Sequence, residues 1–276
     1  MSDPTHDQQQ LLDYLDSFET TLADFTTLVR ELDETEWEVP TDLAGWSVHD
    51  LVSHTAHLEA VIAGAPEETV QVPEGLPHVN SLMGLYTEQG VIARKERSRE
   101  DLLSEIEASA GRRLAQTRAT PPTDGTAKPP RTPGGAPWSW NTMLSNRPLD
   151  IWMHEQDIRR ATGRPGNIDS AGGRHVVKVF GRGLGFVLGK RAGADPGQTA
   201  ALELTDTPVR FVVRIGPDGR GAASDEDVPP DTTLRMSAES FIMLSGGRQP
   251  TETRHVTIEG DQELGARFLA GLAVTP

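Results

Sequence analysis

Residues 45–59 read GWSVHDLVSHTAHLE, and residues 147–160 read RPLDIWMHEQDIRR. Each stretch has the apolar spacing of a helix and places a histidine among its apolar residues. In the second stretch Asp150 precedes His154 by four residues, so the two side chains lie on one helix face. Together with His54 of the first stretch, they could supply three ligands to one divalent metal.

Further helices are predicted around these two stretches. Apolar residues recur at spacings of three and four between residues 11 and 32, as in an amphipathic helix that buries one face. Ser47 is a typical N-cap residue for a helix that ends near residue 63. Pro148 indicates either a kinked helix or a helix that starts near Arg147. The other predicted helices cover residues 81–97, the stretch after Ser98, and residues 141–162. Such helices predict an antiparallel bundle.

The pattern changes after Gly163-Arg164-Pro165-Gly166. A helix interrupted by glycines is expected near residues 176–187, followed by segments of alternating and β-branched residues that predict strands. The expected strands cover residues 201–204, 209–215, 232–236 and 254–259, and the expected helices cover 237–244 and 261–272. Residues 120–137 are rich in proline and glycine and predict a long loop. The sequence therefore predicts an α+β protein with two domains, residues 1–163 and 164–276.

The composition limits the classes of partner. The formal net charge is -15, from 41 acidic and 26 basic residues, which disfavours binding to nucleic acid or to an anionic membrane surface. This acidity is itself typical of a solubility or salt-tolerance adaptation. No stretch approaches the length of a membrane span, and the polar start differs from an export signal. We expect a cytoplasmic protein that is a monomer or a weak dimer.

Three segments resemble the mycothiol-dependent maleylpyruvate isomerase family of actinobacteria: residues 45–54, residues 152–160 and residues 256–272. The resemblance extends over nearly the whole chain. It implies a DinB-like four-helix bundle that holds zinc, followed by a smaller domain similar to sterol carrier proteins. It also implies that His54, Asp150 and His154 are the metal ligands. The founding isomerase has a glutamate where this chain has Asp150, which is one methylene shorter.

Two imidazole nitrogens and one carboxylate oxygen leave the fourth position of a tetrahedral zinc open, as in catalytic zinc sites. A thiol that enters this position loses its proton to solvent or a base more readily. The thiolate could then isomerise an activated double bond by adding and leaving, displace a leaving group, or open an epoxide. The chain has no cysteine, so the thiol must come from a cofactor. The resemblance implies mycothiol.

Other residues of the two stretches have two interpretations each. Arg159 and Arg160 could bind a carboxylate of the substrate or thiol cofactor, or they could stabilise the C-terminal end of their helix. His57 could lie in the cofactor pocket or at the surface, and His49 is expected to face outward. Asp157 could accept a hydrogen bond from a ligand imidazole or form an ion pair with an arginine.

The metal ligands also have simpler interpretations. A single histidine on an apolar helix face is usually a hydrogen-bonded core residue, and Asp150 with His154 could be an ordinary helix-stabilising pair.

The sequence predicts a metal-dependent enzyme, either a mycothiol-dependent isomerase or an S-transferase, acting on a small electrophile such as maleylpyruvate. An alternative is a non-catalytic binding module whose C-terminal domain holds an apolar ligand and whose metal is structural. A third interpretation is a stress-linked paralogue whose thiol partner has changed or been lost. Titratable groups at an open metal site favour the enzyme, and a content of only 5% aromatic residues gives no strong sign of a large lipid pocket.

Overall fold

The computed structural model describes residues 6–225, 229–248 and 255–274. The chain divides into two compact units, residues 1–167 and 168–276. The sequence predicts two domains that meet between residues 163 and 164, and this division stays a prediction. Within the described ranges, no helix is both long enough and apolar enough to cross a membrane.

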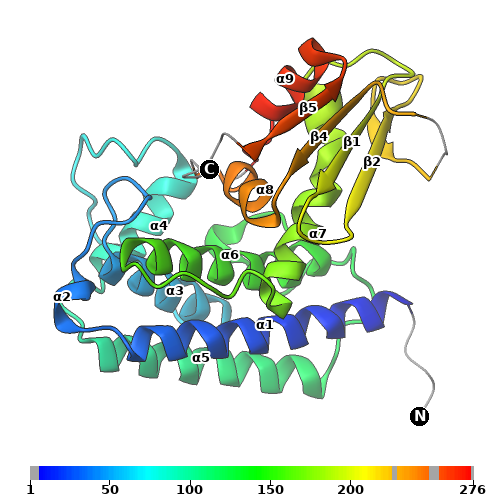
Figure 1. The fold of residues 1–276 in the computed structure, drawn as a ribbon. Helices are drawn as coiled ribbons and strands as arrows, with labels where there is room; N and C mark the ends of the chain where they lie inside the picture. Colours follow the sequence, from blue (N-terminus) through cyan, green and yellow to red (C-terminus); the bar gives the residue numbers. More distant parts are fainter. Residues whose placement is uncertain (1–5, 226–228, 249–254, 275–276) are drawn as a thin grey trace. The chain divides into compact units, whose positions relative to one another are not determined.

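The first unit is helical, and its long helices α1, α3, α5 and α6 run side by side (Figure 1). Helix α1 packs along α6, and α3 packs along α5. The helices of this unit are α1 (His6–Arg30), α2 (Glu34–Trp37), α3 (Val48–Ile62), α4 (Leu82–Ile92), α5 (Arg99–Ala119) and α6 (Trp140–Ala161). The predicted helical bundle is therefore confirmed.

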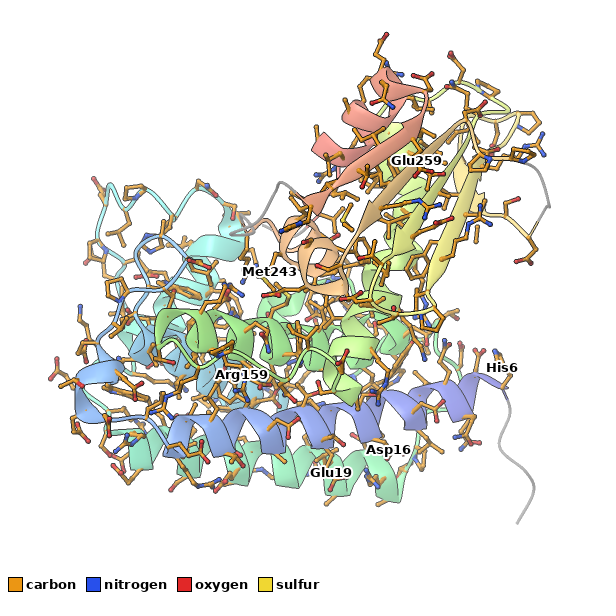
Figure 2. All side chains as sticks on the ribbon, in the orientation of Figure 1. His6, Asp16, Glu19, Arg159, Met243 and Glu259 are labelled. Carbon is orange, nitrogen blue, oxygen red and sulfur yellow. The ribbon has the colours of Figure 1, made fainter. Side chains whose placement is uncertain are left out.

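Serine caps fix where three of the long helices begin. The side chains of Ser47, Ser98 and Ser139 each accept a hydrogen bond from the backbone N–H three residues later. The apolar residues of α1 that recur at helical spacing are buried against the other helices, with Phe18 and Phe25 at most 1% exposed. At the surface, Arg118 of α5 donates to Asp16 and Glu19 of α1, which lie on the outer side of the bundle (Figure 2).

The helix predicted at residues 141–162 is confirmed as α6, and the structure decides between the two alternatives left open at Pro148. One other helix boundary differs from the prediction. Helix α6 continues through Pro148, so it does not begin near Arg147, and Asp150 lies in its third turn. A proline inside a helix removes a single N–H donor, and the Ser139 cap with the packing of α1 along α6 is sufficient to keep the helix continuous. Helix α4 ends at Ile92 rather than near residue 97, and the chain turns before Ser98.

The predicted loop is confirmed, and parts of it are buried in the first unit. Residues 120–139 contain one short 3-10 turn, η1 (Pro133–Gly135). Thr132 is buried and donates its hydroxyl to Ala136 O at 2.7 Å. The loop is also joined to the start of α6, because Asn141 N donates to Gly125 O at 2.9 Å.

The second unit is a mixed sheet covered on one face by helices. Its strands are β1 (Thr199–Leu204), β2 (Arg210–Ile215), β3 (Gly221–Ala223), β4 (Thr232–Met236) and β5 (Thr257–Gly260). The sheet order is β3-β2-β1-β4-β5, in which β1 and β4 are parallel and the other neighbours are antiparallel. Its helices are α7 (Ala171–Phe186), the π-helical turn η2 (Val187–Arg191), α8 (Ala238–Ser245) and α9 (Gln262–Ala270). The predicted α+β class is confirmed.

Strand β3 was not predicted, because its three residues carry no β-branched or aromatic side chain. Strand β5 begins at Thr257, and Arg254, where the predicted strand began, lies outside the described residues.

The glycines of α7 do not interrupt the helix as predicted. They allow the sheet to approach it closely. A Cβ added at Gly181 would lie 2.3 Å from the Phe211 ring, and one added at Gly185 would lie 2.4 Å from Gly221 O. Because Gly221 offers only backbone there, the contact at Gly185 has no flexible side chain that could move away.

Gly185→Ala should therefore destabilise the second unit, by about 1–3 kcal/mol, as overpacking does elsewhere. Gly183→Ala is the matched control, since a Cβ there meets nothing within 4 Å in the same helix. That change should stabilise the protein by about 0.5–1 kcal/mol, because alanine favours a helix more than glycine. Urea unfolding of the full chain measures both, and a stabilising Gly185→Ala would contradict the close approach of α7 to β3.

Candidate metal centre

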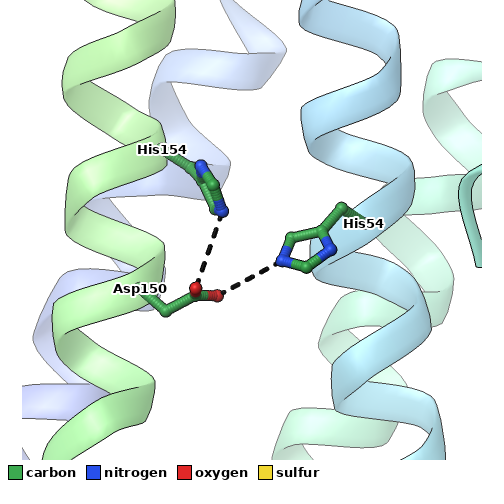
Figure 3. A group of neighbouring side chains, drawn as sticks. All are labelled: His54, Asp150 and His154. Carbon is green, nitrogen blue, oxygen red and sulfur yellow. Dashed lines mark ion pairs between the residues drawn. The ribbon is translucent and has the colours of Figure 1, made fainter. Parts of the chain in front are cut away.

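Helices α3 and α6 bring His54, Asp150 and His154 together (Figure 3). His54 Nε2 lies 3.6 Å from Asp150 Oδ2, and His154 Nε2 lies 3.6 Å from Asp150 Oδ1. These separations are too long for hydrogen bonds. One ligand atom from each residue lies within 4.8 Å of the other two. The sequence-predicted trio is thus a single cluster.

The spacing of the three side chains fits a metal ion. Ligand bonds of 2.0–2.1 Å at tetrahedral angles put two zinc ligands about 3.3 Å apart. The two measured nitrogen-to-oxygen distances of 3.6 Å are close to this value. His154 Nε2 is buried and has no hydrogen-bond partner among the residues that the structure describes. A buried, unpartnered nitrogen beside a carboxylate is the arrangement that a divalent cation would satisfy.

The neighbours of His154 fix its orientation. His154 Nδ1 lies 3.3 Å from Asp157 Oδ2, while Arg160 Nη2 donates to Asp157 Oδ1 at 2.5 Å. Asp157 therefore has both roles that the sequence allowed. With Nδ1–H donating to a carboxylate, Nε2 of a neutral imidazole is left as the free acceptor, which is the form that binds metals.

The electrostatics of His54 and Asp150 favour the protonation states that bind a metal. Burial lowers the pKa of His54, with further lowering from the charges of His154 and Arg147, so this imidazole is neutral near pH 7. Burial alone would raise the pKa of Asp150, but the charge of Arg147, together with His154, holds that pKa well below its usual value. A neutral imidazole and an ionised carboxylate are the metal-binding forms of both groups.

A buried ion network lies behind Asp150, and the sequence did not predict it. Arg147 donates to Asp150 and to Glu59, and Arg113 also donates to Glu59. Burial would raise the pKa of Glu59, but the charges of Arg113 and Arg147 lower it, so Glu59 remains ionised. The one available signal was the i, i+3 spacing of Arg147 and Asp150; nothing local indicated that Glu59 is buried.

The three predicted cofactor-binding residues lie in different surroundings. Arg159 donates to Glu155 at 2.7 Å, and Arg160 donates to Asp42 at 2.7 Å as well as to Asp157. His57 is fully buried, and its two ring nitrogens have no hydrogen-bond partner within the described part of the chain. A Cβ added at Gly90 would lie 2.2 Å from its ring. Binding of a cofactor by these residues stays a prediction.

The expectation for His49 was wrong. Its side chain is buried, its Nε2 lies 3.2 Å from Arg97 O, and its ring packs edge-on against Trp37 at 5.2 Å. The turn before α5, which contains Arg97, covers this face of α3. The apolar pattern of one helix does not indicate such a contact.

Trp46 and Trp152 both have packing roles. Trp152 is completely buried, and its Nε1 donates to Asn167 O at 3.3 Å. The Trp46 ring lies 5.0 Å from the His54 ring, and its Nε1 donates to Glu88 at 2.8 Å. Trp46 also lines a surface groove of about 430 Å³. The Trp46 ring is therefore an apolar surface beside His54.

The fold and this cluster define a class of protein: a helical bundle with two histidines and an aspartate gathered between two helices, followed by a small α+β unit. The chain belongs to the family of the mycothiol maleylpyruvate isomerase N-terminal domain, whose model matches residues 18–159. A second model, the SCP-2 sterol transfer family, matches residues 191–272.

Two solved structures share this fold. A crystal structure of the mycothiol-dependent maleylpyruvate isomerase is 16% identical, with a TM-score of 0.58, over 90% of this chain and 92% of the other. A histidine-to-alanine mutant of that isomerase is 14% identical, with a TM-score of 0.55 over the same shares. Among curated protein sequences, none matches the chain significantly.

The buried position of His57 has a consequence for stability. Burial, with the charges of Arg94 and His54, lowers the pKa of His57 to about 3. In the unfolded chain a histidine titrates near pH 6.5. Between these two values unfolding takes up a proton at His57, so this residue contributes stability above about pH 6.5 that is lost as the pH falls.

In the metal-free protein, His57→Leu should therefore reduce the loss of stability between about pH 6 and pH 4. The slope should become shallower by up to about 1.4 kcal/mol per pH unit, the value for one proton. Urea unfolding at several pH values, with a chelator present, measures this slope. His6→Gln, at an exposed histidine, is the control. Equal slopes for wild type and His57→Leu would show that His57 is not buried in its neutral form.

Proposed function

We propose that this protein is a metal-dependent enzyme that uses a low-molecular-weight thiol to act on a small electrophilic substrate. The observation that carries the proposal is the convergence of His54, Asp150 and His154 from two helices, with donor spacing that suits one divalent cation. The family of its N-terminal domain supports the same proposal. Mycothiol is the first thiol to test, because the solved neighbours are mycothiol-dependent.

Each residue of the centre has a defined part in this proposal. His54, Asp150 and His154 would hold the metal, and Asp157 would keep His154 in the tautomer that presents Nε2. A bound divalent metal would supply a Lewis-acidic centre that lowers the pKa of a thiol. Zinc is favoured by the resemblance, while imidazole and carboxylate ligands also suit nickel or iron. Since the chain has no cysteine, the sulfur nucleophile must belong to a separate molecule.

The rival function is a binding module for an apolar ligand, in which the metal is structural. The match of residues 191–272 to the SCP-2 sterol transfer family favours this rival. An activity assay distinguishes the enzyme from the binding module. A binding module should bind an apolar ligand without turnover, whether or not thiol and metal are present. Three protein ligands with one coordination position left over favour the enzyme.

The purified protein should bind about one divalent metal per chain. Elemental analysis after removal of free metal measures the stoichiometry. His54→Ala and His154→Ala should each lose most of the metal, because each removes one of only three ligands. His255→Ala, at an exposed histidine of the second unit, is the control and should keep full occupancy. Unchanged stoichiometry in both ligand variants would rule out the site.

Addition of mycothiol to the cobalt-substituted protein should produce a sulfur-to-cobalt charge-transfer absorption. Asp150→Ala should weaken or abolish it, because the metal is then held by two imidazoles alone. Turnover should require both metal and thiol, tested first with maleylpyruvate and then with other electrophiles. Full turnover without any thiol, or a cobalt spectrum that saturating thiol does not change, would contradict thiol use.

A further inference from the structure

Four charged side chains form a continuous row, of which three are buried and the last, Asp150, is partly exposed. Arg147 Nη1 donates to Asp150 Oδ2 at 2.9 Å, and Arg147 Nε donates to Glu59 Oε1 at 2.9 Å. Arg113 Nη2 donates to Glu59 Oε2 at 2.8 Å. Glu59 is fully buried, and the side chain of Arg147 is 1% exposed. We call Arg113, Glu59, Arg147 and Asp150 the buried row.

Stability alone does not account for the buried row. Removing charges from water costs free energy that their attraction only partly offsets, and apolar residues of similar volume are often as stabilising. The row is also incompletely paired, because Arg147 Nη2 and Arg113 Nη1 are buried and find no hydrogen-bond partner in the described ranges. A specific role for its geometry is therefore needed.

The geometry determines the direction of the Asp150 carboxylate. The Arg147 guanidinium is planar, and its Nε and Nη1 donate to two different carboxylates, so its orientation is fixed at two points. Glu59 is in turn fixed by Arg113, which lies over the Phe18 ring at 4.1 Å. The Asp150 side chain is 23% exposed, so without Arg147 it could rotate toward solvent. Arg147 keeps it between the two imidazoles.

The row does this without adding net charge beside the metal position. Arg147 alone would repel a cation, but Glu59 lies against the same guanidinium. Counting ionised groups, the two arginines of the row balance its two carboxylates. Positioning and charge can therefore be separated by experiment, because removal of Glu59 and Arg147 together leaves the sum unchanged.

We propose that Arg147, held in place by Glu59, is a positioning residue that orients Asp150 for metal binding. This inference rests on the proposed function, since it assumes that Asp150 is a metal ligand. Neither Arg147 nor Glu59 is required to touch the metal, the thiol or the substrate. Partners that orient a metal ligand typically affect metal affinity by about 10–100-fold.

The test is the double variant Glu59→Gln/Arg147→Gln in the full chain. Its affinity for Co²⁺, measured by competition with a chromogenic chelator, should fall by about 10–100-fold with one cobalt still bound per chain at saturation. The visible spectrum of the bound cobalt should also change, because that spectrum reports the arrangement of the ligands. A purely structural role would lower the unfolding midpoint without altering the spectrum.

The matched control is Arg94→Gln/Glu105→Gln. Arg94 is as buried as Arg113, and its Nη2 donates to Glu105 Oε1 at 2.7 Å. This control also removes one buried positive and one negative charge from the first unit. It should lower stability but leave the cobalt affinity and spectrum unchanged.

Should the double variant fail to fold, Arg147→Lys carries the test, because it keeps the charge and loses the planar two-point contact. It should lower cobalt affinity and change the spectrum in the same direction. Wild-type affinity and spectrum in the folded double variant, or in Arg147→Lys, would overturn the positioning role alone. A wild-type protein that binds no cobalt would overturn the proposed function and this inference together.

Discussion

Glu59 is an ionised carboxylate that has no access to water, so its charge must be balanced by positively charged side chains of the protein. It extends from α3, and its partners Arg113 and Arg147 extend from α5 and α6. Removing one partner from a buried ion pair costs about 3–5 kcal/mol. The three helices are therefore held at one relative rotation and register, and that register is what places His54 opposite Asp150 and His154.

Local signals were sufficient to predict most of the helices. Serine caps and apolar spacing depend on residues within a few positions of each other, so Ser47 and the stripe of α1 could be interpreted directly. Pro148 left two alternatives open, because the effect of a proline on a helix depends on what packs around it. His49 was predicted wrongly because the residues that cover it, Trp37 and Arg97, belong to other segments of the chain.

The second unit shows the same limit in another form. Glycines 181 and 185 are weak helix formers, and a sequence pattern treats them as breaks. In the structure they are the places where Phe211 and Gly221 approach the helix. For the candidate site, the pair Asp150 and His154 follows from spacing on one helix, whereas the choice of His54 over His57 or His49 needed the family resemblance. The partners of Arg159 and Arg160 depend on tertiary contacts, and no local pattern indicates them.

The contact between Arg147 and Asp150 also limits how this centre can change during evolution. The founding isomerase has a glutamate where this chain has Asp150. In this chain, the extra methylene of Asp150→Glu would move the carboxylate relative to the Arg147 guanidinium, which Glu59 holds in place. A change at position 150 alone would then disturb both the metal ligands and a buried charge. The two positions should show epistasis, so that the longer acid is tolerated only on a background in which residue 147 or its anchor has already been replaced.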